Sequence, residues 1–157
     1  MKLTHWLIAC SAIACMTSCD PNRLYEQNQT IEGDAWDQND IKTFNIDIPD
    51  TVQPYNVFIN IREATGYPFS NLFLFVTTTF PNQKALTDTV EIMLKDQSGE
   101  SMGSGLGDIW DHQVMWKHAV RFPQAGTYRI SLQQAMRVEK LPLIMDVGIR
   151  VAKFENE

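Results

Sequence analysis

The segment 118–136, HAVRFPQAGTYRISLQQAM, decides the fold of this 157-residue chain. A short strand leads into a proline-to-glycine loop, after which Tyr128, Ile130 and Leu132 alternate with polar residues. Alternation at a period of two is typical of a strand with one buried face. Many β-sandwiches have this arrangement at a corner, where the glycine permits the bend and the buried tyrosine ring sends its hydroxyl to the backbone. The segment therefore predicts a β-sandwich with Tyr128 and Ile130 in its core.

The same period recurs along the chain after residue 40, and helical spacing is almost absent. Seven or eight such strands predict an all-β fold, a single antiparallel β-sandwich of the jelly-roll or immunoglobulin-like type over residues 41–154. The segment QQAMRVEKL at 133–141 lacks an N-cap residue and is interpreted as a strand end plus loop. In the last strand, Met145 and Val147 are expected on one face, together with Ile149 and Val151. Besides the segment quoted first, the expected strands are TFNIDI (43–48), YNVFINIR (55–62), NLFLFVTTTF (71–80), LTDTVEIML (86–94), MGSGLGDIWD (102–111) and LIMDVGIRV (143–151).

Three of the eight glycines, Gly103, Gly105 and Gly107, follow one another at two-residue spacing. One face of a strand there has no side chains, so we expect another part of the protein to pack closely against it. The stretch lacks the following helix and lysine that a phosphate-binding loop needs. We therefore interpret the segment from Gly103 to Trp110 as a candidate contact site.

The N-terminus has the order of an export signal: Lys2, an apolar run over residues 3–16, then small residues. The apolar run is shorter than the roughly 20 residues that a membrane-spanning helix needs. The residues MTS before Cys19 fit a bacterial lipoprotein site, at which the cysteine thiol receives a diacylglyceryl group. Cys15, which follows AIA, is the alternative. We predict a lipoprotein signal at 1–18 and a lipidated Cys19.

Removal of that signal leaves a chain without a free thiol, so the core has to hold without disulfide bonds. The full chain has a net charge of −6, and loss of Lys2 makes the mature chain one unit more negative. This charge argues against nucleic acid as a partner and against a polybasic membrane patch. The acyl chains then anchor the protein, because two or three of them hold a protein at a bilayer where one does not. Residues 19–40 are rich in Asn, Gln and Asp and are interpreted as the lipidated N-terminus and a polar tether that partly docks.

Several segments of the chain together match one known family: SCD (18–20), PYNVFINIR (54–62), YPFSNLFLFV (67–76), TDTVEIML (87–94), GSGLGDI (103–109), FPQAGTYRISLQQAMR (122–137) and DVGIRV (146–151). With these segments the chain resembles the gliding-motility lipoproteins of the GldH type. The resemblance implies an envelope lipoprotein that is anchored in the inner or outer membrane of a didermic bacterium and is needed for surface gliding. It also implies association with the machinery that exports and moves surface adhesins. It implies no enzymatic activity and no cofactor, and only the lipidated cysteine is carried over, to Cys19.

The sequence gives little sign of catalysis or metal binding. His112 and His118 lie near Asp108 and Asp111, but residues six apart in a strand are about 20 Å from each other. We therefore expect solvated histidines and no metal site. There is no nucleophile motif, and scattered carboxylates offer facing pairs only by chance. We accordingly expect a protein that is not an enzyme.

Binding has better support, because Trp36, Trp110 and Trp116 are expected in or beside loops. Together with arginines at 62, 121 or 137 they could form a contact surface for protein or glycan. The alternative is that these rings close the ends of the sandwich. A surface glycan-binding lipoprotein is the rival function.

Gln134 interrupts the apolar alternation and should point inward. A buried amide needs partners, so we expect it to hydrogen-bond backbone carbonyls or the glycine stretch, with Arg137 at the rim. The residues predicted to contact partners are Trp110, Trp116, Arg62, Arg137 and Gln134.

Overall fold

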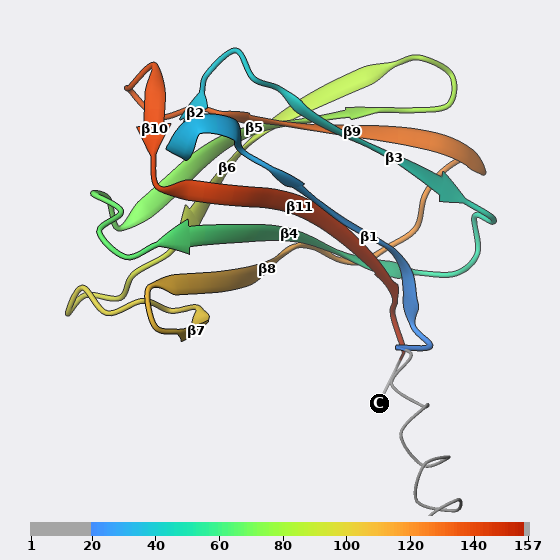
Figure 1. Ribbon diagram of the computed structural model, residues 1–157. Helices are drawn as coiled ribbons and strands as arrows, with labels where there is room; N and C mark the ends of the chain where they lie inside the picture. The colour runs from blue at the N-terminus through green and yellow to red at the C-terminus, as the bar shows by residue number, and fades with distance from the viewer. Residues whose placement is uncertain (1–19, 156–157) are drawn as a thin grey trace, which may run out of the picture.

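The computed structural model describes residues 20–155 and shows two antiparallel sheets that face each other (Figure 1). The larger sheet has the order β1 (Arg23–Thr30), β11 (Ile144–Lys153), β4 (Tyr55–Ala64), β8 (Ile109–Val120) and β7 (Ser104–Leu106). The smaller has the order β3 (Lys42–Ile48), β9 (Gly126–Gln134), β5 (Asn71–Thr79) and β6 (Ala85–Met93). A ribbon of β2 (Ala35–Asp37) and β10 (Lys140–Pro142), with the short 3-10 helix η1 (Glu32–Asp34), covers one end. The prediction of an all-β sandwich is confirmed.

Alternation along the strands builds the core between the two sheets. Along β4, the residues from Tyr55 to Ile61 are buried at every second position, and the residues between them are partly exposed. In β11 a register shift near Ile144 and Asp146 changes this pattern at the start of the strand, so Ile144 is buried and Met145 is exposed. The expectation that Met145 shares the buried face of Val147 is therefore wrong, because a β-bulge turns the side chain outward.

The corner after β8 has the predicted geometry. Tyr128 is fully buried, and its ring packs edge-on against Phe122 and Phe80, with centroid distances of 4.8 and 5.5 Å. Its hydroxyl donates to the carbonyl oxygen of Gln124 at 3.0 Å and accepts from the amide of the same residue at 3.2 Å. Gly126 has φ +127°, which few other residues adopt. The corner thus fixes the start of β9 against the core.

The segment interpreted as a tether is largely part of the sandwich. Residues Arg23–Thr30 form β1, which pairs with β11 along its length, from Arg23 opposite Ala152 to Thr30 opposite Asp146. Trp36, in β2, is completely buried and donates its indole N–H to the carbonyl oxygen of Asp40 at 2.7 Å. The predicted start of the sandwich at residue 41 is therefore too late, because the sandwich includes β1. The polar sequence of β1 hides this, since an edge strand is held by backbone hydrogen bonds and needs few apolar side chains. The predicted signal at 1–18 and Cys19 lie outside the described residues.

The glycine stretch forms β7 and the turn into β8. An ideal Cβ on Gly103 would lie 2.7 Å from the carbonyl oxygen of Asp111, and one on Gly105 would lie 2.5 Å from that of Ile109. Gly107 has φ +73° in the two-residue turn between the strands. The expected close packing is therefore found, and β8 itself is the partner.

No helix among residues 20–155 is long and apolar enough to cross a membrane.

Candidate functional site

The described chain starts at a fixed point of the sandwich. The carboxylate of Asp20 pairs with the guanidinium of Arg150 on β11, and its other oxygen accepts the amide of Asn22 at 3.1 Å. Arg150 also lies 3.7 Å from the carboxylate of Glu26 on β1. Cys19, the predicted lipidation residue, directly precedes this anchored aspartate.

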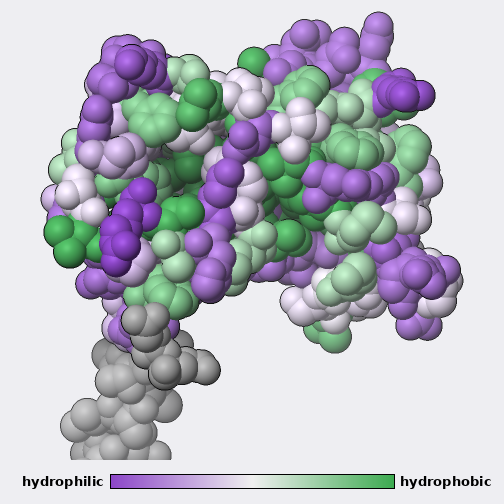
Figure 2. Space-filling model, turned by 180° about the vertical axis from the view of Figure 1, so that it is seen from behind, coloured by the Kyte–Doolittle hydropathy of each residue, from purple (hydrophilic) through white to green (hydrophobic). Residues whose placement is uncertain are grey.

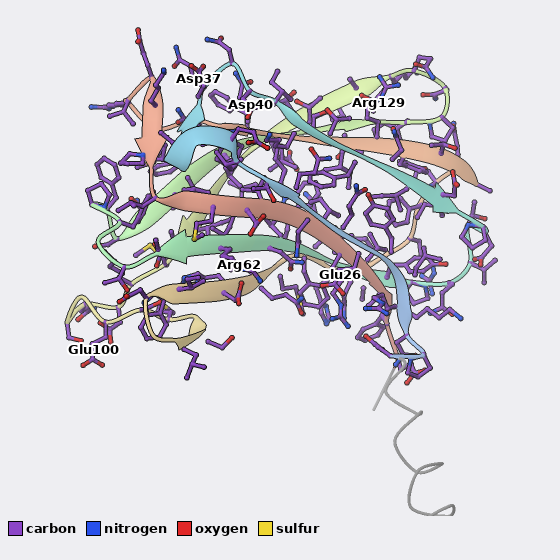
Figure 3. The ribbon with its side chains drawn as sticks, viewed as in Figure 1. Glu26, Asp37, Asp40, Arg62, Glu100 and Arg129 are labelled. Carbon is purple, nitrogen blue, oxygen red and sulfur yellow. The ribbon has the colours of Figure 1, made fainter. Side chains whose placement is uncertain are left out.

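The outer face of the five-stranded sheet carries a polar network that includes Arg62 and Glu26 (Figure 3). Arg62, on β4, donates to Asp111 of β8 at 2.7 Å and to Asp146 of β11 at 3.1 Å. The hydrogen bond to Asp111 raises the pKa of the Arg62 guanidinium, and the charges of both carboxylates add to the effect. Asn60 extends the network by donating to Glu26 at 3.2 Å. Arg62, a predicted contact residue, is therefore committed to ion pairs that join three strands.

Gly148 lies in the middle of that face, where its lack of a side chain leaves space for the polar network. An ideal Cβ there would lie 1.9 Å from the amide oxygen of Asn28 and 2.6 Å from the carbonyl oxygen of Gln27, both on β1. We expect Gly148→Ala to lower the free energy of unfolding by about 1–3 kcal/mol, because the β1 backbone has to shift. Urea unfolding of the single variant and of Asn28→Ala/Gly148→Ala measures this. The double variant should recover only part of the loss, and a Gly148→Ala protein as stable as the wild type would contradict the close approach.

A buried pair, Glu63 and His112, lies at the inner face of the same sheet. The imidazole Nε2 of His112 is 3.2 Å from Oε1 of Glu63, and the side chains are 2% and 1% exposed. The second carboxylate oxygen, Oε2, has no hydrogen-bond partner in the described part of the protein. Burial, and then the charge of Glu63, raises the pKa of the nearby Tyr67 hydroxyl. The sequence contained a signal for this pair, because Glu63 continues the series of buried odd-numbered positions of β4.

The two histidines of the sandwich have different surroundings. The expectation of a solvated residue is wrong for His112, whereas His118 is exposed and packs its ring edge-on against Phe154, with centroids 5.0 Å apart. Between residues 20 and 155, no three His, Cys, Asp or Glu side chains are grouped so that they could hold a metal ion.

The three tryptophans of the described chain lie in separate environments. Trp36 is a core residue, so the expectation that it lies beside a loop as a contact residue is wrong. Trp110 is half-buried over Gly105 and donates to the hydroxyl of Thr65 at 3.3 Å. Trp116 is half-buried against the core, with the ammonium of Lys117 4.7 Å from its ring centroid. These rings do not form one aromatic surface.

Gln134 points inward, as predicted. Its amide nitrogen donates to the carbonyl oxygens of Val138 at 2.9 Å and Glu139 at 3.3 Å, and its oxygen accepts the amide of Met136 at 2.9 Å. The backbone partners are confirmed, and the glycine stretch is not among them. Because Gln134 is only 2% exposed, it orders the loop before β10 and is not available to a partner, while Arg137 is exposed at the rim.

The structure does not bring the predicted contact residues together. Arg62, Trp110, Arg137 and Trp116 line four different hollows. The last of these is an apolar cleft of about 330 Å³ between the two sheets, which the sequence analysis missed. Its available sequence signal was Leu86, an apolar residue that the alternation of β6 places on the same face as the buried Ile92.

Comparison with known proteins places the chain in a family. Residues 23–151 match the family model of the GldH lipoprotein. A protein named gliding motility lipoprotein GldH homolog, from Christiangramia forsetii, is 36% identical over 92% of both chains. Gliding motility lipoprotein GldH of Flavobacterium johnsoniae is 33% identical over 96% of this chain and 98% of its own length. These similarities extend across the sandwich, its polar edge strand β1 included, and the chain therefore belongs to the GldH lipoprotein family.

Proposed function

We propose that the protein is a non-enzymatic scaffold of the gliding apparatus, held at an envelope membrane by acyl chains on Cys19. Membership of the GldH lipoprotein family and relatives named for gliding motility support a lipid-anchored cell-envelope protein with a role in gliding. The absence of catalysis, the association with other gliding proteins and the position of the lipid are our proposal. The lipid restricts the sandwich to one membrane leaflet and so raises its effective concentration towards envelope partners.

One observation carries the proposal: Asp20, the residue after the predicted lipid site, is fixed to Arg150, so the chain next to that site is held against the sandwich. A diffusing catalyst has no need of such an attachment. A scaffold benefits, because its binding surfaces are then held at a defined place beside the bilayer.

We expect Cys19→Ala to move the protein from the membrane fraction to the soluble fraction, because acyl chains are its proposed anchor. Fractionation of the native bacterium and mass measurement of the tryptic peptide 19–23 test this. Cys15→Ala is the matched control and should leave the protein in the membrane. Release by Cys15→Ala but not by Cys19→Ala would assign the lipid to Cys15, and a wild-type peptide 19–23 without lipid mass would refute the anchor.

Purification of the intact lipoprotein in mild detergent, followed by identification of bound proteins, tests the scaffold role. We expect other envelope proteins to co-purify and to be absent when the Cys19→Ala protein is purified from the soluble fraction. Recovery of the wild-type lipoprotein alone would count against a scaffold.

The rival function, glycan binding, requires coplanar exposed rings. Of the tryptophans in the described chain, Trp36 is buried, and Trp110 and Trp116 are half-buried in different hollows. This arrangement favours the scaffold over the sugar-binding module.

A further inference from the structure

The two long sides of the sandwich differ in how the edge strands of the two sheets are linked. On the side of β1 and β3, Gln29 donates its amide to the carbonyl oxygen of Thr43 at 2.7 Å and links the two sheets. On the opposite side, β6 is the last strand of its sheet, and β7 covers only Ile109–Asp111 of β8. The outer edge of β6, and that of β8 beyond Asp111, therefore pair with no further strand in the described part of the chain.

The apolar cleft lies between these two open edges. Its lining includes the buried Val57, Ile130 and Phe122 and the half-buried Trp116, and it also includes Leu86 of β6, which is 64% exposed and so lies at the mouth. Figure 2, which views the molecule from behind, shows hydrophobic side chains gathered in a hollow that hydrophilic side chains cross. Apolar surface of this kind on a folded protein marks a binding site.

The free edges determine which class of occupant suits the cleft. An acyl chain would fill the apolar space but would leave the backbone N–H and C=O groups of both edges without partners. An extended polypeptide fills the space and also supplies partners to one of the edges, because its backbone hydrogen-bonds that edge while every second side chain enters the cleft. The observations therefore favour a strand.

β6 is the better receptor of the two edges. It pairs with β5 without irregularity from Ala85 to Met93, and so presents a regular row of outward backbone groups. β8 has register shifts opposite Val57 and Phe58, and Ala119 has φ +49°. Such irregularities disrupt the ladder locally, so β8 is the poorer template for an added strand.

The charges at the mouth restrict what can enter. Asp88 of β6 and Lys117 of β8 form an ion pair of 2.8 Å across the opening, with both side chains about half exposed. An inward-pointing charge such as Asp88 is a device that protects edge strands from indiscriminate pairing. Arg121 also lines the mouth and donates to the carbonyl oxygen of Val52, so cations exceed carboxylates among the lining residues. A carboxylate on a partner can replace Asp88 as the ion-pair partner of Lys117.

We propose that β6 receives an extended segment of an envelope partner protein, which has apolar side chains at alternate positions and a carboxylate that meets Lys117. The segment adds a strand to the smaller sheet and closes the open side of the sandwich. This inference rests on the proposed scaffold function and names the kind of partner segment that the scaffold holds.

The test places a photoreactive p-benzoylphenylalanine at position 86 of the full lipoprotein in the native membrane. The same group at position 106 is the matched control, because Leu106 is 95% exposed on the edge strand of the other sheet. We expect an adduct at position 86 and none at 106, and mass spectrometry then gives the sequence of the joined segment.

That segment is next synthesised as a peptide and added to the detergent-solubilised lipoprotein. We expect it to protect the amide hydrogens of 85–93 from exchange and to lose this effect when alternate peptide nitrogens are methylated. Leu86→Asp should weaken peptide binding by about 10-fold or more, because it removes an apolar contact and repels the carboxylate. Leu106→Asp should leave binding within about 2-fold of the wild type. Circular dichroism melting of both variants shows whether each remains folded.

The outcomes separate the two levels of the proposal. If the lipoprotein co-purifies with envelope proteins but gives no adduct at position 86, strand docking is refuted and the scaffold stands. The same holds if the methylated peptide binds as well as the normal one, or if oleate occupies the cleft in place of a peptide. If the lipoprotein co-purifies with no protein, the scaffold proposal fails, and strand docking fails with it.

Discussion

Replacing Tyr128 by alanine is expected to lower the free energy of unfolding by about 3 kcal/mol or more. The ring is fully buried between Phe80 and Phe122, and its hydroxyl makes two hydrogen bonds to the backbone of Gln124. Truncation would therefore open a cavity, remove two aromatic contacts and leave the loop polar groups unpaired. Urea unfolding followed by tryptophan fluorescence measures the change.

Tyr128→Phe is the control for the hydroxyl, because it keeps the ring. We expect it to cost about 1 kcal/mol, the usual net value of such hydrogen bonds. A loss below about 1 kcal/mol for Tyr128→Ala would contradict the role of this residue as the corner of the sandwich.

Replacing His112 by leucine is expected to destabilise the fold by about 3–5 kcal/mol. Leucine has a similar size, so the packing under Gly103 changes little, but the carboxyl group of Glu63 remains buried with neither oxygen bonded. The double variant Glu63→Leu/His112→Leu removes both polar groups. It should be clearly more stable than the single variant, because an apolar pair needs no hydrogen bonds.

A double-mutant cycle in denaturant, completed with Glu63→Leu, gives the coupling between the two side chains. If the losses of the two single variants simply add in the double variant, the pair is not coupled and our interpretation of it is wrong.

The sequence predicted the sandwich because its strongest signals are local. The spacing of Pro123, Gly126 and Tyr128 specifies a corner without reference to any distant residue. The alternation from Tyr55 to Ile61 specifies a buried face in the same way. The inward orientation of Gln134 was predictable for the same reason, because the pattern of β9 fixes the face on which it lies.

What the sequence could not predict depends on contacts between distant residues. β1 is polar and looks like a linker, yet pairing with β11 makes it a strand. Trp36 is buried because β10 pairs with its strand from more than a hundred residues away. The cleft between β6 and β8 is likewise invisible in either strand alone, because it arises from the order of strands in the two sheets.

The ion pair between Asp20 and Arg150 has a further consequence for orientation. A chain spans at most about 3.5 Å per residue, so the lipid proposed on Cys19 would hold Asp20 close to the headgroups. The C-terminal end of β11 lies beside the same point, since the amide of Lys153 donates to the carbonyl oxygen of Asn22 at 2.7 Å. On this proposal the end of the sandwich that carries Asp20 faces the bilayer, and proteins embedded in the same leaflet can approach the body by lateral diffusion.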